Sequence, residues 1–437
     1  METGQQPASS VPTDVSVAVM ILNWNGRFLL QTCLPPLVEQ TYTNYQVMVV
    51  DNGSTDDSVP FVREQFPQVQ LIQNGANLGF SRGTNAGLRQ ISADVVVLLN
   101  NDVRVQPNWL MELIRPFHQD PQIGIVGCKL LYPDGTIQHL GAELTYPLAH
   151  SHHFYYKEPD LTQVEVLQDV PYVTGASLAV RREVLDTIGL LDEAFHPFYY
   201  EEVDFCTRAR NAGFRVVVTP RAVAIHDESA TMRNVSGLKL QTLHRNRLYY
   251  VLKHYAPQQF LQDFVPAEAT FLSEQPVLPE LDALQLAYFR TAVPYPPVAP
   301  ETSDAQIMAI RAALLQLRHT AILAKAKALQ PPPALTEFEF PANRSWFNKL
   351  AARVRDAWSQ VAAKWLVRSL IQQQHQQNLY LLQQVEALHN QAAIQAQEID
   401  MLLASLPAQP KQQDLASVIA RLQQRLDQLE AHMEQQQ

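Results

Sequence analysis

The chain has 437 residues, 46% of them hydrophobic, which is enough for one substantial core and a second region. Its formal net charge of -10 argues against a protein that coats nucleic acid, because such proteins present basic surfaces to the phosphate backbone. The three cysteines are widely separated and have neither zinc-site spacing nor the even count of a disulfide framework, which is typical of reduced core thiols in the cytosol.

The N-terminal residues 1–14 are polar, and we expect them to be disordered. They lack a basic segment followed by an apolar stretch, so they do not have the pattern of a signal peptide. No segment offers eighteen consecutive apolar residues that would span a bilayer. These features predict a cytoplasmic protein.

The N-terminal part of the chain alternates apolar strands with helices. Strands are predicted at residues 15–22, 46–50, 69–72 and 94–102. Helices are predicted between them at residues 28–38, 54–66 and 81–91, the second capped by Ser54 or Thr55. This βαβ alternation indicates an α/β domain with a mostly parallel sheet.

The strand at residues 94–102 is the one around which this domain is organised. Its continuous apolar run is typical of a strand buried on both faces, and it ends in Asn100, Asn101 and Asp102. Ligands of open α/β sheets bind at this carboxyl edge, where a carboxylate can hold a divalent cation beside a phosphate. Taken alone, the segment also fits an ordinary polar turn after a strand.

Polar groups also follow the first two strands, at Asn23 and Asn25 and again from Asp51 to Asp56. The next helix carries Gly83 and Gly87 on one face, which would let it approach the sheet or a ligand closely. The glycine spacing fits neither a dinucleotide fingerprint nor a phosphate-binding P-loop. The pattern therefore predicts a nucleotide-binding sheet of another type.

Later elements are predicted as a helix at residues 109–117, a strand at 123–131, a long irregular region at 134–169, a helix entered at 181–185 and a strand at 215–218. A loop as long as 134–169 inside a compact domain is more often a binding surface. His226 follows the last strand, and an isolated histidine there is more often structural than a ligand.

A cluster of three carboxylates, Glu201, Glu202 and Asp204, follows an aromatic segment. Their mutual repulsion and burial would raise at least one pKa, which suits a general base. Helical spacing places Glu201 and Asp204 on one face and turns Glu202 away by about a third of a turn. The alternative explanation is an acidic helix start favoured by the helix dipole.

In their order along residues 15–250, these motifs resemble the family 2 glycosyltransferases, in particular the bacterial rhamnosyltransferase-like branch. The motifs that carry the resemblance are Asn23-Trp24-Asn25, Val50-Asp51-Asn52-Gly53-Ser54-Thr55-Asp56, Asn77-Leu78-Gly79-Phe80, Leu99-Asn100-Asn101-Asp102, Thr174-Gly175-Ala176, Leu191-Asp192-Glu193, Glu201-Glu202-Val203-Asp204 and His226. Each motif is weak alone, but eight in the family's order make a specific signal.

The resemblance implies a GT-A (Rossmann-like) domain that binds a nucleoside-diphosphate sugar and inverts the anomeric carbon. It implies a catalytic base at Glu202, with Glu201 second, and Mg²⁺ or Mn²⁺ at Asp102 with His226 as a further ligand. The implied donor-binding residues are Asn23, Asn25, Asp51, Asn52, Ser54, Asn77, Gly79, Phe80, Asn85, Asn100 and Asn101. On the acceptor side it implies Gly175, Ala176 and Asp204, facing a glycan or lipid-linked acceptor in polysaccharide synthesis.

The sequence departs from the family pattern at two places. Its metal motif carries one carboxylate, Asp102, after two amides, so the ion should be held weakly without the diphosphate. The family's base motif is usually Glu-Asp, whereas this chain has Glu201-Glu202. A second Glu is chemically competent as a base.

Beyond residue 256 the resemblance ends and a helical C-terminal region is predicted. Residues 257–340 form a Pro-rich linker with one helix at 303–329, and residues 341–371 a basic, Trp-bearing amphipathic helix that fits either a membrane surface or the catalytic domain. Residues 372–437 repeat apolar positions in steps of four and three between 381 and 433, which predicts coiled-coil segments and a homo-oligomer.

Two other functions compete with a transferase. A catalytically idle nucleotide-sugar scaffold would act through its coiled coil, but it would not need the clustered carboxylates. A glycoside hydrolase needs two carboxylates that flank a sugar, and the strand-end Asp51 and Asp102 suit a nucleotide better. We therefore expect a transferase at the inner face of the cell membrane or in the cytoplasm.

Overall fold

The computed structural model describes residues 14–160, 166–227, 236–274, 278–292, 298 and 301–328. The expectations for the disordered N-terminus, for the basic helix at 341–371 and for the coiled coil at 372–437 lie outside these residues, apart from Asp14.

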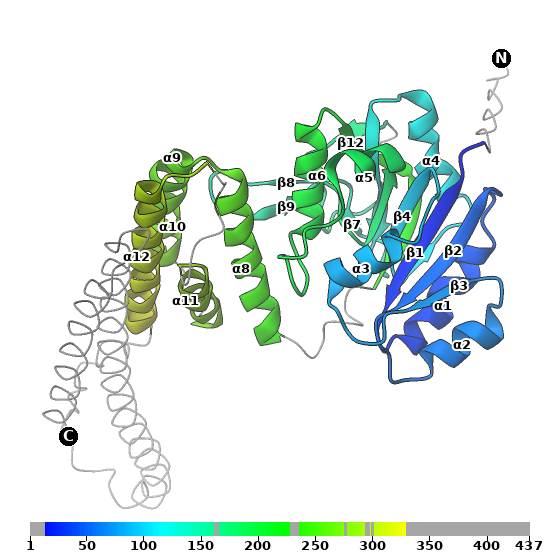
Figure 1. The fold of residues 1–437 in the computed structure, drawn as a ribbon, viewed down its shortest axis with the longest axis horizontal. Coiled ribbons are helices and arrows are strands. Elements are labelled where there is room, and N and C mark those ends of the chain that lie inside the picture. The colour runs from blue at the N-terminus through cyan, green and yellow to red at the C-terminus, as the bar shows by residue number, and fades with distance from the viewer. Residues whose placement is uncertain are drawn as a thin grey trace, which may run out of the picture. The chain divides into compact units, whose positions relative to one another are not determined.

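A ten-stranded sheet forms the centre of the domain (Figure 1), with the strand order β10-β12-β6-β11-β4-β1-β2-β3 and with β5 and β7 paired to β12 and β6. Its strands are β1 Val17–Asn23, β2 Tyr45–Asp51, β3 Gln70–Gln73, β4 Val95–Asn100, β5 Val103–Val105, β6 Ile123–Leu131, β7 Ile137–His139, β10 Gln168–Asp169, β11 Ser177–Arg181 and β12 Arg215–His226. A separate hairpin pairs β8 Ala142–Leu144 with β9 Ser151–His153. The predicted GT-A-like, mostly parallel α/β architecture is confirmed.

Strands β1 to β4 form the parallel half that the sequence predicts, with β1 between β2 and β4. The helices α1 Arg27–Val38, α2 Ser58–Gln65, α3 Phe80–Leu88 and α4 Trp109–Gln119 accompany these strands. Alternate residues of β1 pack into two different cores, Val19 into one and Met20 into the other. Helices therefore cover both faces of the sheet, which is why its central strands are continuously apolar.

The predicted cap of α2 is wrong, because the helix begins only at Ser58. Ser54 Oγ accepts a hydrogen bond from the backbone N–H of Asn25 at 2.9 Å, and the backbone N–H of Thr55 donates to Asn25 Oδ1 at 2.7 Å. These two residues therefore join the turn after β2 to the turn after β1 instead of starting a helix.

Strand β11 was not predicted from the sequence, which suggested only a segment that enters a helix. The strand lies antiparallel to β4 on one side and to β6 on the other, and α5 Arg182–Ile188 follows it directly. The irregular region at 134–169 also contains the short strands β7, β8, β9 and β10. The sheet is therefore mixed beyond β4.

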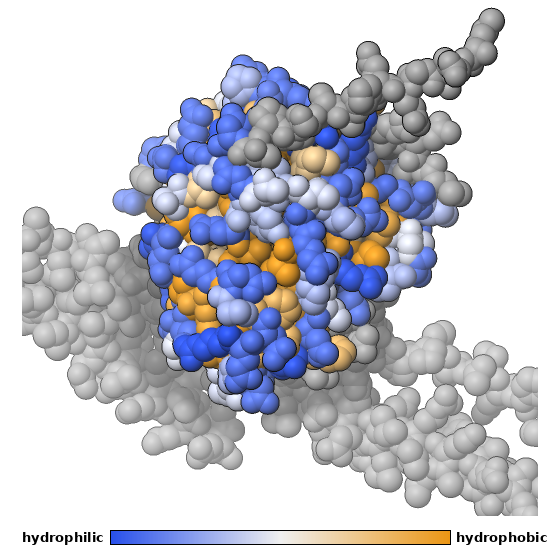
Figure 2. Space-filling model, turned by 90° about the vertical axis from the view of Figure 1, so that its right-hand side faces the viewer, coloured by the Kyte–Doolittle hydropathy of each residue, from blue (hydrophilic) through white to orange (hydrophobic). Residues whose placement is uncertain are grey.

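The open edge of the sheet on the parallel side is β3, which has only four residues, and both of its end residues, Gln70 and Gln73, are exposed. Figure 2 views this side of the molecule and shows apolar residues in the middle of the face, with hydrophilic residues around them. A short edge strand with polar ends limits pairing with another chain.

The described part of 257–328 is helical and packed, which corrects the prediction of a linker with one helix. After α6 Glu201–Asn211 and β12, the chain forms α8 Ser236–His254, α9 Pro257–Gln259, the π-helix η1 Phe260–Phe264, α10 Val265–Glu274, α11 Leu278–Ala292 and α12 Asp304–Ala328. Helix α12 confirms the predicted helix. Fully buried Phe264, Leu284 and Leu314 join these helices into the same apolar core as α8. The apolar residues are spread around each helix because neighbours contact it on several sides, so no single stripe marks them.

Among the described residues, one helical segment, Asp304–Lys325 within α12, is long and apolar enough by length and composition to cross a membrane, and 33% of its most apolar stretch is buried in the protein. Helices that pack into a protein core meet the same criterion. Arg311 and Arg318 interrupt the apolar residues of this segment, so it is not a continuous apolar span.

A buried ion pair fastens α8 to α10, and we expect its disruption to unfold the helical region. Arg247 and Glu268 are both almost fully buried, Arg247 Nη1 donates to Glu268 Oε2 at 3.0 Å, and the Tyr288 hydroxyl donates to the same carboxylate. Glu268→Gln leaves a buried guanidinium without its counter-charge and should cost about 3–5 kcal/mol in urea unfolding. The double variant Arg247→Met, Glu268→Leu should lose much less. A Glu268→Gln protein within about 1 kcal/mol of wild type would contradict this role.

Candidate functional site

The site begins where three parallel strands end at one edge of the sheet. Asn23, Asp51 and Asn100 are the last residues of β1, β2 and β4, and the strand register sets Asn23 opposite Asp51 and Leu22 opposite Asn100. The structure therefore brings together the polar groups that the sequence placed at separate strand ends. In open α/β sheets this edge is the ligand-binding edge.

The amide of Asn23 ties these strand ends together. Its Nδ2 donates to Ser54 Oγ at 3.3 Å and lies 3.5 Å from Asp51 Oδ1, while its Oδ1 accepts from Asn101 Nδ2 at 2.9 Å. Asn23 and Asp51 are almost fully buried, whereas Asn101 is partly exposed. The floor of the site is thus fixed by side-chain hydrogen bonds, and Asn25 joins the adjacent turn as described above.

Asn52 and Asn85, two further predicted donor-binding residues, also have both ends of their amides bonded within the protein. Asn52 Nδ2 donates to Asn77 Oδ1 at 3.1 Å, and Asn52 Oδ1 accepts from the backbone N–H of Leu78 at 3.2 Å. Asn85 bonds to the backbone N–H and carbonyl of Leu191 at 3.1 and 2.9 Å. In this structure these hydrogen bonds hold Asn52 and Asn85 within the walls of the site. The sequence does not tell which way an amide points.

Asp102 and His226 meet at the end of β4 because β5, which starts at the next residue, pairs with the end of β12 and sets Val103 opposite His226. His226 Nε2 lies 3.1 Å from Asp102 Oδ1, and both side chains are largely buried. On its other side, His226 Nδ1 lies 2.7 Å from Gln138 Oε1. The amide oxygen can only accept, so Nδ1 carries the proton and a neutral ring turns the lone pair of Nε2 toward the carboxylate.

The Nε2 lone pair and the carboxylate oxygen can both coordinate one cation that lies between them. The residues present therefore fit a divalent ion. They supply two ligands, and among the described residues no group of three or more His, Cys, Asp or Glu side chains could hold a metal. An ion at this place would need further oxygen ligands in addition to these two side chains. A diphosphate offers such oxygens.

The segment with Thr174, Gly175 and Ala176 lies beside this edge, since the backbone N–H of Asn100 donates to the Ala176 carbonyl at 3.0 Å. A Cβ atom at Gly175 would lie 3.6 Å from Glu202 Cβ and 3.7 Å from Phe80 Cζ. Gly175, Phe80 and Glu202 are therefore neighbours, although Gly175 lies in the turn before β11, Phe80 in α3 and Glu202 in α6. Predicted donor, acceptor and base residues meet here.

Glu201 and Glu202 open α6 after two residues in the left-handed region, Tyr199 with φ 76° and Tyr200 with φ 69°. Such backbone costs about 1–3 kcal/mol per residue and is found mostly at functional sites. The Oε2 atoms of Glu201 and Glu202 have no hydrogen-bond partner among the described residues. Burial raises the pKa of Glu202 to about 7, and burial together with the neighbouring charge of Glu202 raises the pKa of Glu201 well above its usual value.

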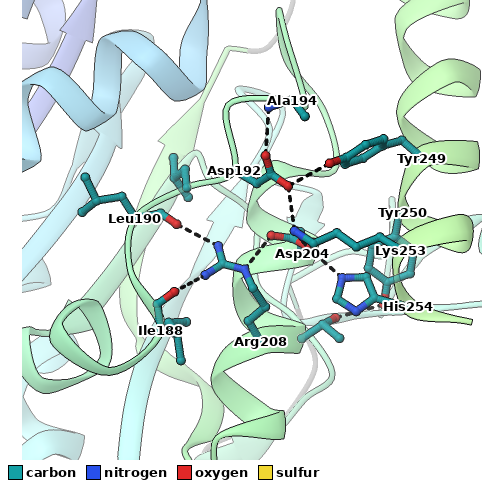
Figure 3. A network of polar contacts seen from close by, with 12 residues as sticks. Ile188, Leu190, Asp192, Ala194, Asp204, Arg208, Tyr249, Tyr250, Lys253 and His254 are labelled. Carbon is teal, nitrogen blue, oxygen red and sulfur yellow. Dashed lines mark hydrogen bonds and ion pairs between the residues drawn. The ribbon is translucent and has the colours of Figure 1, made fainter. Parts of the chain in front are cut away.

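Asp204, which was predicted on the acceptor side, is enclosed within the fold. Its carboxylate is fully buried and bonds to Arg208 Nε at 2.7 Å, Lys253 Nζ at 2.7 Å and His254 Nε2 at 2.8 Å (Figure 3). Burial alone would raise its pKa, but the hydrogen bond from His254 and the charges of Arg208 and Lys253 lower the pKa to about 2. Asp204 therefore anchors α6 and is too weak a base for proton abstraction at neutral pH.

Sequence reasoning missed the residues whose hydrogen bonds and ion pairs fix the site residues in place, above all Gln138 on β7 and Asn246 and Lys253 on α8. Gln138 lies in the region taken as irregular, and α8 lies at the end of the resemblance. Only their burial and hydrogen bonds in the folded chain reveal them. No spacing in the sequence marks either position.

Comparison with known proteins gives a family for this geometry. A family model described as "Glycosyltransferase like family 2" matches residues 12–249, more than half of the chain. The chain is 34% identical over 215 residues to the "O-antigen biosynthesis protein RfbC" of Myxococcus xanthus, covering 47% of this chain and 17% of that protein. It is 25% identical over 266 residues to the "N-acetylglucosaminyl-diphospho-decaprenol L-rhamnosyltransferase" of Mycobacterium tuberculosis, covering 56% of this chain and 86% of that enzyme.

The matched part of this chain spans only 17% of the length of RfbC and 28% of the length of a relative from Sinorhizobium fredii. A solved structure of similar fold is "Mannosyltransferase PcManGT from Pyrobaculum calidifontis in complex with GDP-Man and Mn2+", at 19% identity and a TM-score of 0.43, covering 74% of this chain and 91% of that one.

Proposed function

Since the chain belongs to glycosyltransferase family 2, we propose that it moves a sugar from a nucleoside-diphosphate sugar to an acceptor hydroxyl with inversion at the anomeric carbon. The single observation that carries this proposal is the position of Glu202. This carboxylate, whose pKa burial raises to about 7, neighbours Phe80 and Gly175 beside the sheet edge that presents Asp102 and His226.

In this proposal the nucleotide lies along the carboxyl edge of the sheet. Asp51 and the turn of Asn23 and Asn25 contact the base and ribose, and Asn77 to Phe80 line the donor sugar and its diphosphate. Asn100 and Asn101 complete the floor. Support comes from the exposure of Asn77 and the partial exposure of Phe80, Asn100 and Asn101 beside a rigid hydrogen-bonded base.

Asp102 Oδ1 and His226 Nε2 would hold a divalent cation, Mg²⁺ or Mn²⁺. When bound, the ion acts as a Lewis acid that stabilises the charge developing on the leaving diphosphate. Gln138 keeps the proton of His226 on Nδ1 and so keeps Nε2 available as a ligand. Because the described residues offer no group of three or more His, Cys, Asp or Glu side chains here, we expect weak metal binding without the donor.

Glu202 accepts the proton of the acceptor hydroxyl as that oxygen attacks the anomeric carbon. The new bond forms on the face opposite the breaking bond to the diphosphate oxygen, so the configuration inverts. A carboxylate with a pKa near 7 is a stronger base than an ordinary glutamate and is still about half ionised at neutral pH. Gly175 leaves space in front of it, since a side chain there would contact both Glu202 and Phe80.

We further propose a role in the synthesis of a polysaccharide or related glycan, with a glycan or lipid-linked acceptor, at the inner face of the cell membrane. The names of the Myxococcus and Mycobacterium relatives support this class of acceptor.

The competing proposal is an idle nucleotide-sugar scaffold. The adjacent carboxyl groups of Glu201 and Glu202, whose Oε2 atoms are buried without a hydrogen bond among the described residues, speak against it, because a site without chemistry has no need of such a costly pair of acids. The first experiment is a thermal-shift screen of sugar nucleotides with Mn²⁺. A donor at 100 times its Kd should stabilise the protein by about 2.7 kcal/mol, and no stabilisation by any donor would contradict both proposals. Turnover then separates the enzyme from the scaffold.

We propose that residues 372–437 set assembly and are not needed for chemistry, because their apolar seam shares no residue with the motifs of the site. A chain ending at Ile371 should keep its activity per active site and lose oligomer mass in light scattering. If the shortened and full-length chains formed oligomers of the same subunit number, the coiled-coil hypothesis would be wrong. If the shortened chain lost activity, residues 372–437 would be needed for the chemistry.

A further inference from the structure

The side chain of Asn246 on α8 is completely buried, and the hydrogen bonds of its amide fix its orientation. Its Nδ2 donates to the carbonyls of Phe198 at 2.8 Å and Tyr199 at 2.9 Å, and its Oδ1 accepts from Arg245 Nη1 at 3.1 Å. Carbonyl oxygens only accept, so the amide nitrogen must point toward residues 198 and 199. One side chain thus joins α8 to the segment directly before α6.

This segment holds the strained backbone that leads to the paired carboxylates. Tyr199 and Tyr200 are consecutive left-handed residues, and the Tyr200 carbonyl accepts the first hydrogen bond of α6, from the Asp204 N–H at 2.9 Å. Without a partner for the carbonyls, ordinary sterics would return Tyr199 and Tyr200 to negative φ. Such a change would rotate the start of α6 and the direction of Glu202.

Arg245, which precedes Asn246 on α8, also binds this segment. Its guanidinium donates to the Ala194 carbonyl at 2.9 Å and to the His196 carbonyl, in addition to Asn246. On the donor side, the backbone N–H of Phe80 donates to the Pro197 carbonyl at 2.8 Å. The segment therefore lies between α8 and the first residue of α3, and Asn246 fixes the part of it closest to Glu202.

A second contact between α8 and α6 is independent of Asn246. Lys253 Nζ lies 2.7 Å from both Asp192 and Asp204, which fixes α6 one turn further along (Figure 3). This contact sets the position of the helix, while the Asn246 contact sets the backbone at its first residue. Loss of Asn246 should therefore disturb the first turn without releasing the helix.

We propose that Asn246 is a positioning residue that orients Glu202 toward the acceptor hydroxyl by holding the left-handed turn at residues 199 and 200. The inference rests on the proposed function, because it needs Glu202 as the base. A merely structural role of Asn246 would change stability but not the chemical step alone.

The test measures kcat, donor KM and melting temperature for the full chain and for Asn246→Ala and Asn246→Asp. The isosteric Asp keeps the packing but turns an oxygen toward two carbonyls. Both changes should lower kcat by about 10- to 100-fold, since a misplacement of about 1 Å can cost that much, and should leave donor KM within a few-fold. The control Thr207→Val removes the 3.0 Å hydrogen bond to Tyr250 between the same two helices and should keep kcat.

A double-variant cycle distinguishes action through Glu202 from any other effect. In the Glu202→Gln background, Asn246→Ala should cost little further rate, because the base that it orients is already gone. Additive losses, or an unchanged kcat in both Asn246 variants, would overturn the inference while leaving the proposed function intact. Absence of turnover by the wild-type chain with every sugar nucleotide would overturn both.

Discussion

Replacing Asp102 with Ala should abolish turnover and remove the metal dependence of nucleotide binding. The carboxylate stands at the end of the central strand, 3.1 Å from His226 Nε2, and it is the charged member of a pair that would hold the cation. With Asp102 gone, one neutral imidazole remains, which does not retain Mg²⁺ or Mn²⁺ on its own. We expect the rate to fall to background and Mn²⁺ to have no effect on the donor's Kd in calorimetry.

The matched control is Asp186→Ala, which removes an exposed carboxylate on α5. This variant should bind donor and metal as wild type does. His226→Ala should weaken metal-assisted binding less than Asp102→Ala, because it removes no negative charge. If Asp102→Ala transferred sugar at the wild-type rate with EDTA present, the metal role of this residue would be wrong.

The second large effect is expected for Glu202→Gln, which should lower kcat by about 10² to 10⁴ while donor affinity stays within a few-fold. The amide keeps the size of the side chain and its place beside Gly175 and Phe80 but cannot accept a proton. Rapid-quench measurement of product in a single turnover isolates this step. Glu183→Gln, an exposed glutamate in the first turn of α5, is the matched control and should be neutral.

The pH profile gives an independent signature of the same group. Burial raises the pKa of Glu202 to about 7, so the base is protonated and inactive below that pH and ionised above it. The value of kcat/KM should therefore rise about tenfold per pH unit below the pKa and level off above it. Because burial and the charge of Glu202 raise the pKa of Glu201, Glu201 is neutral while Glu202 ionises, so Glu201→Gln should leave the midpoint near its wild-type pH and reduce kcat less than Glu202→Gln does. If Glu201→Gln lowered kcat more than Glu202→Gln did, Glu201 would be the base and Glu202 its neighbour.

The sequence predicted the parallel half of the fold well because its signals there are local. Each strand of that half is an apolar run that ends in polar residues, so the alternation alone indicates that Asn23, Asp51 and Asn100 share an edge. Strand β11 escaped prediction because its five residues follow a glycine-containing turn and lead straight into a helix. Its antiparallel pairing depends on contacts distant in the chain.

The roles of single polar residues were harder to predict than their neighbourhood. Asn85 and Asp204 lie within or beside the motifs of the site, yet both bond inside the protein. Asn85 bonds to Leu191, and Asp204 bonds to Arg208, Lys253 and His254. Asn246 has no motif at all and contacts the base segment only because α8 folds back onto it. A sequence shows which residues are polar, whereas the fold decides which of them face the ligand.

The account is tested most directly by the release of free nucleoside diphosphate from a panel of sugar nucleotides, measured with Mn²⁺ and with EDTA. We predict that the wild-type chain turns over at least one donor with Mn²⁺, that EDTA stops the reaction, and that Glu202→Gln binds the same donor but releases nucleoside diphosphate about 10² to 10⁴ times more slowly. A protein that binds a donor and releases no nucleoside diphosphate, or a Glu202→Gln variant as fast as wild type, would contradict the account.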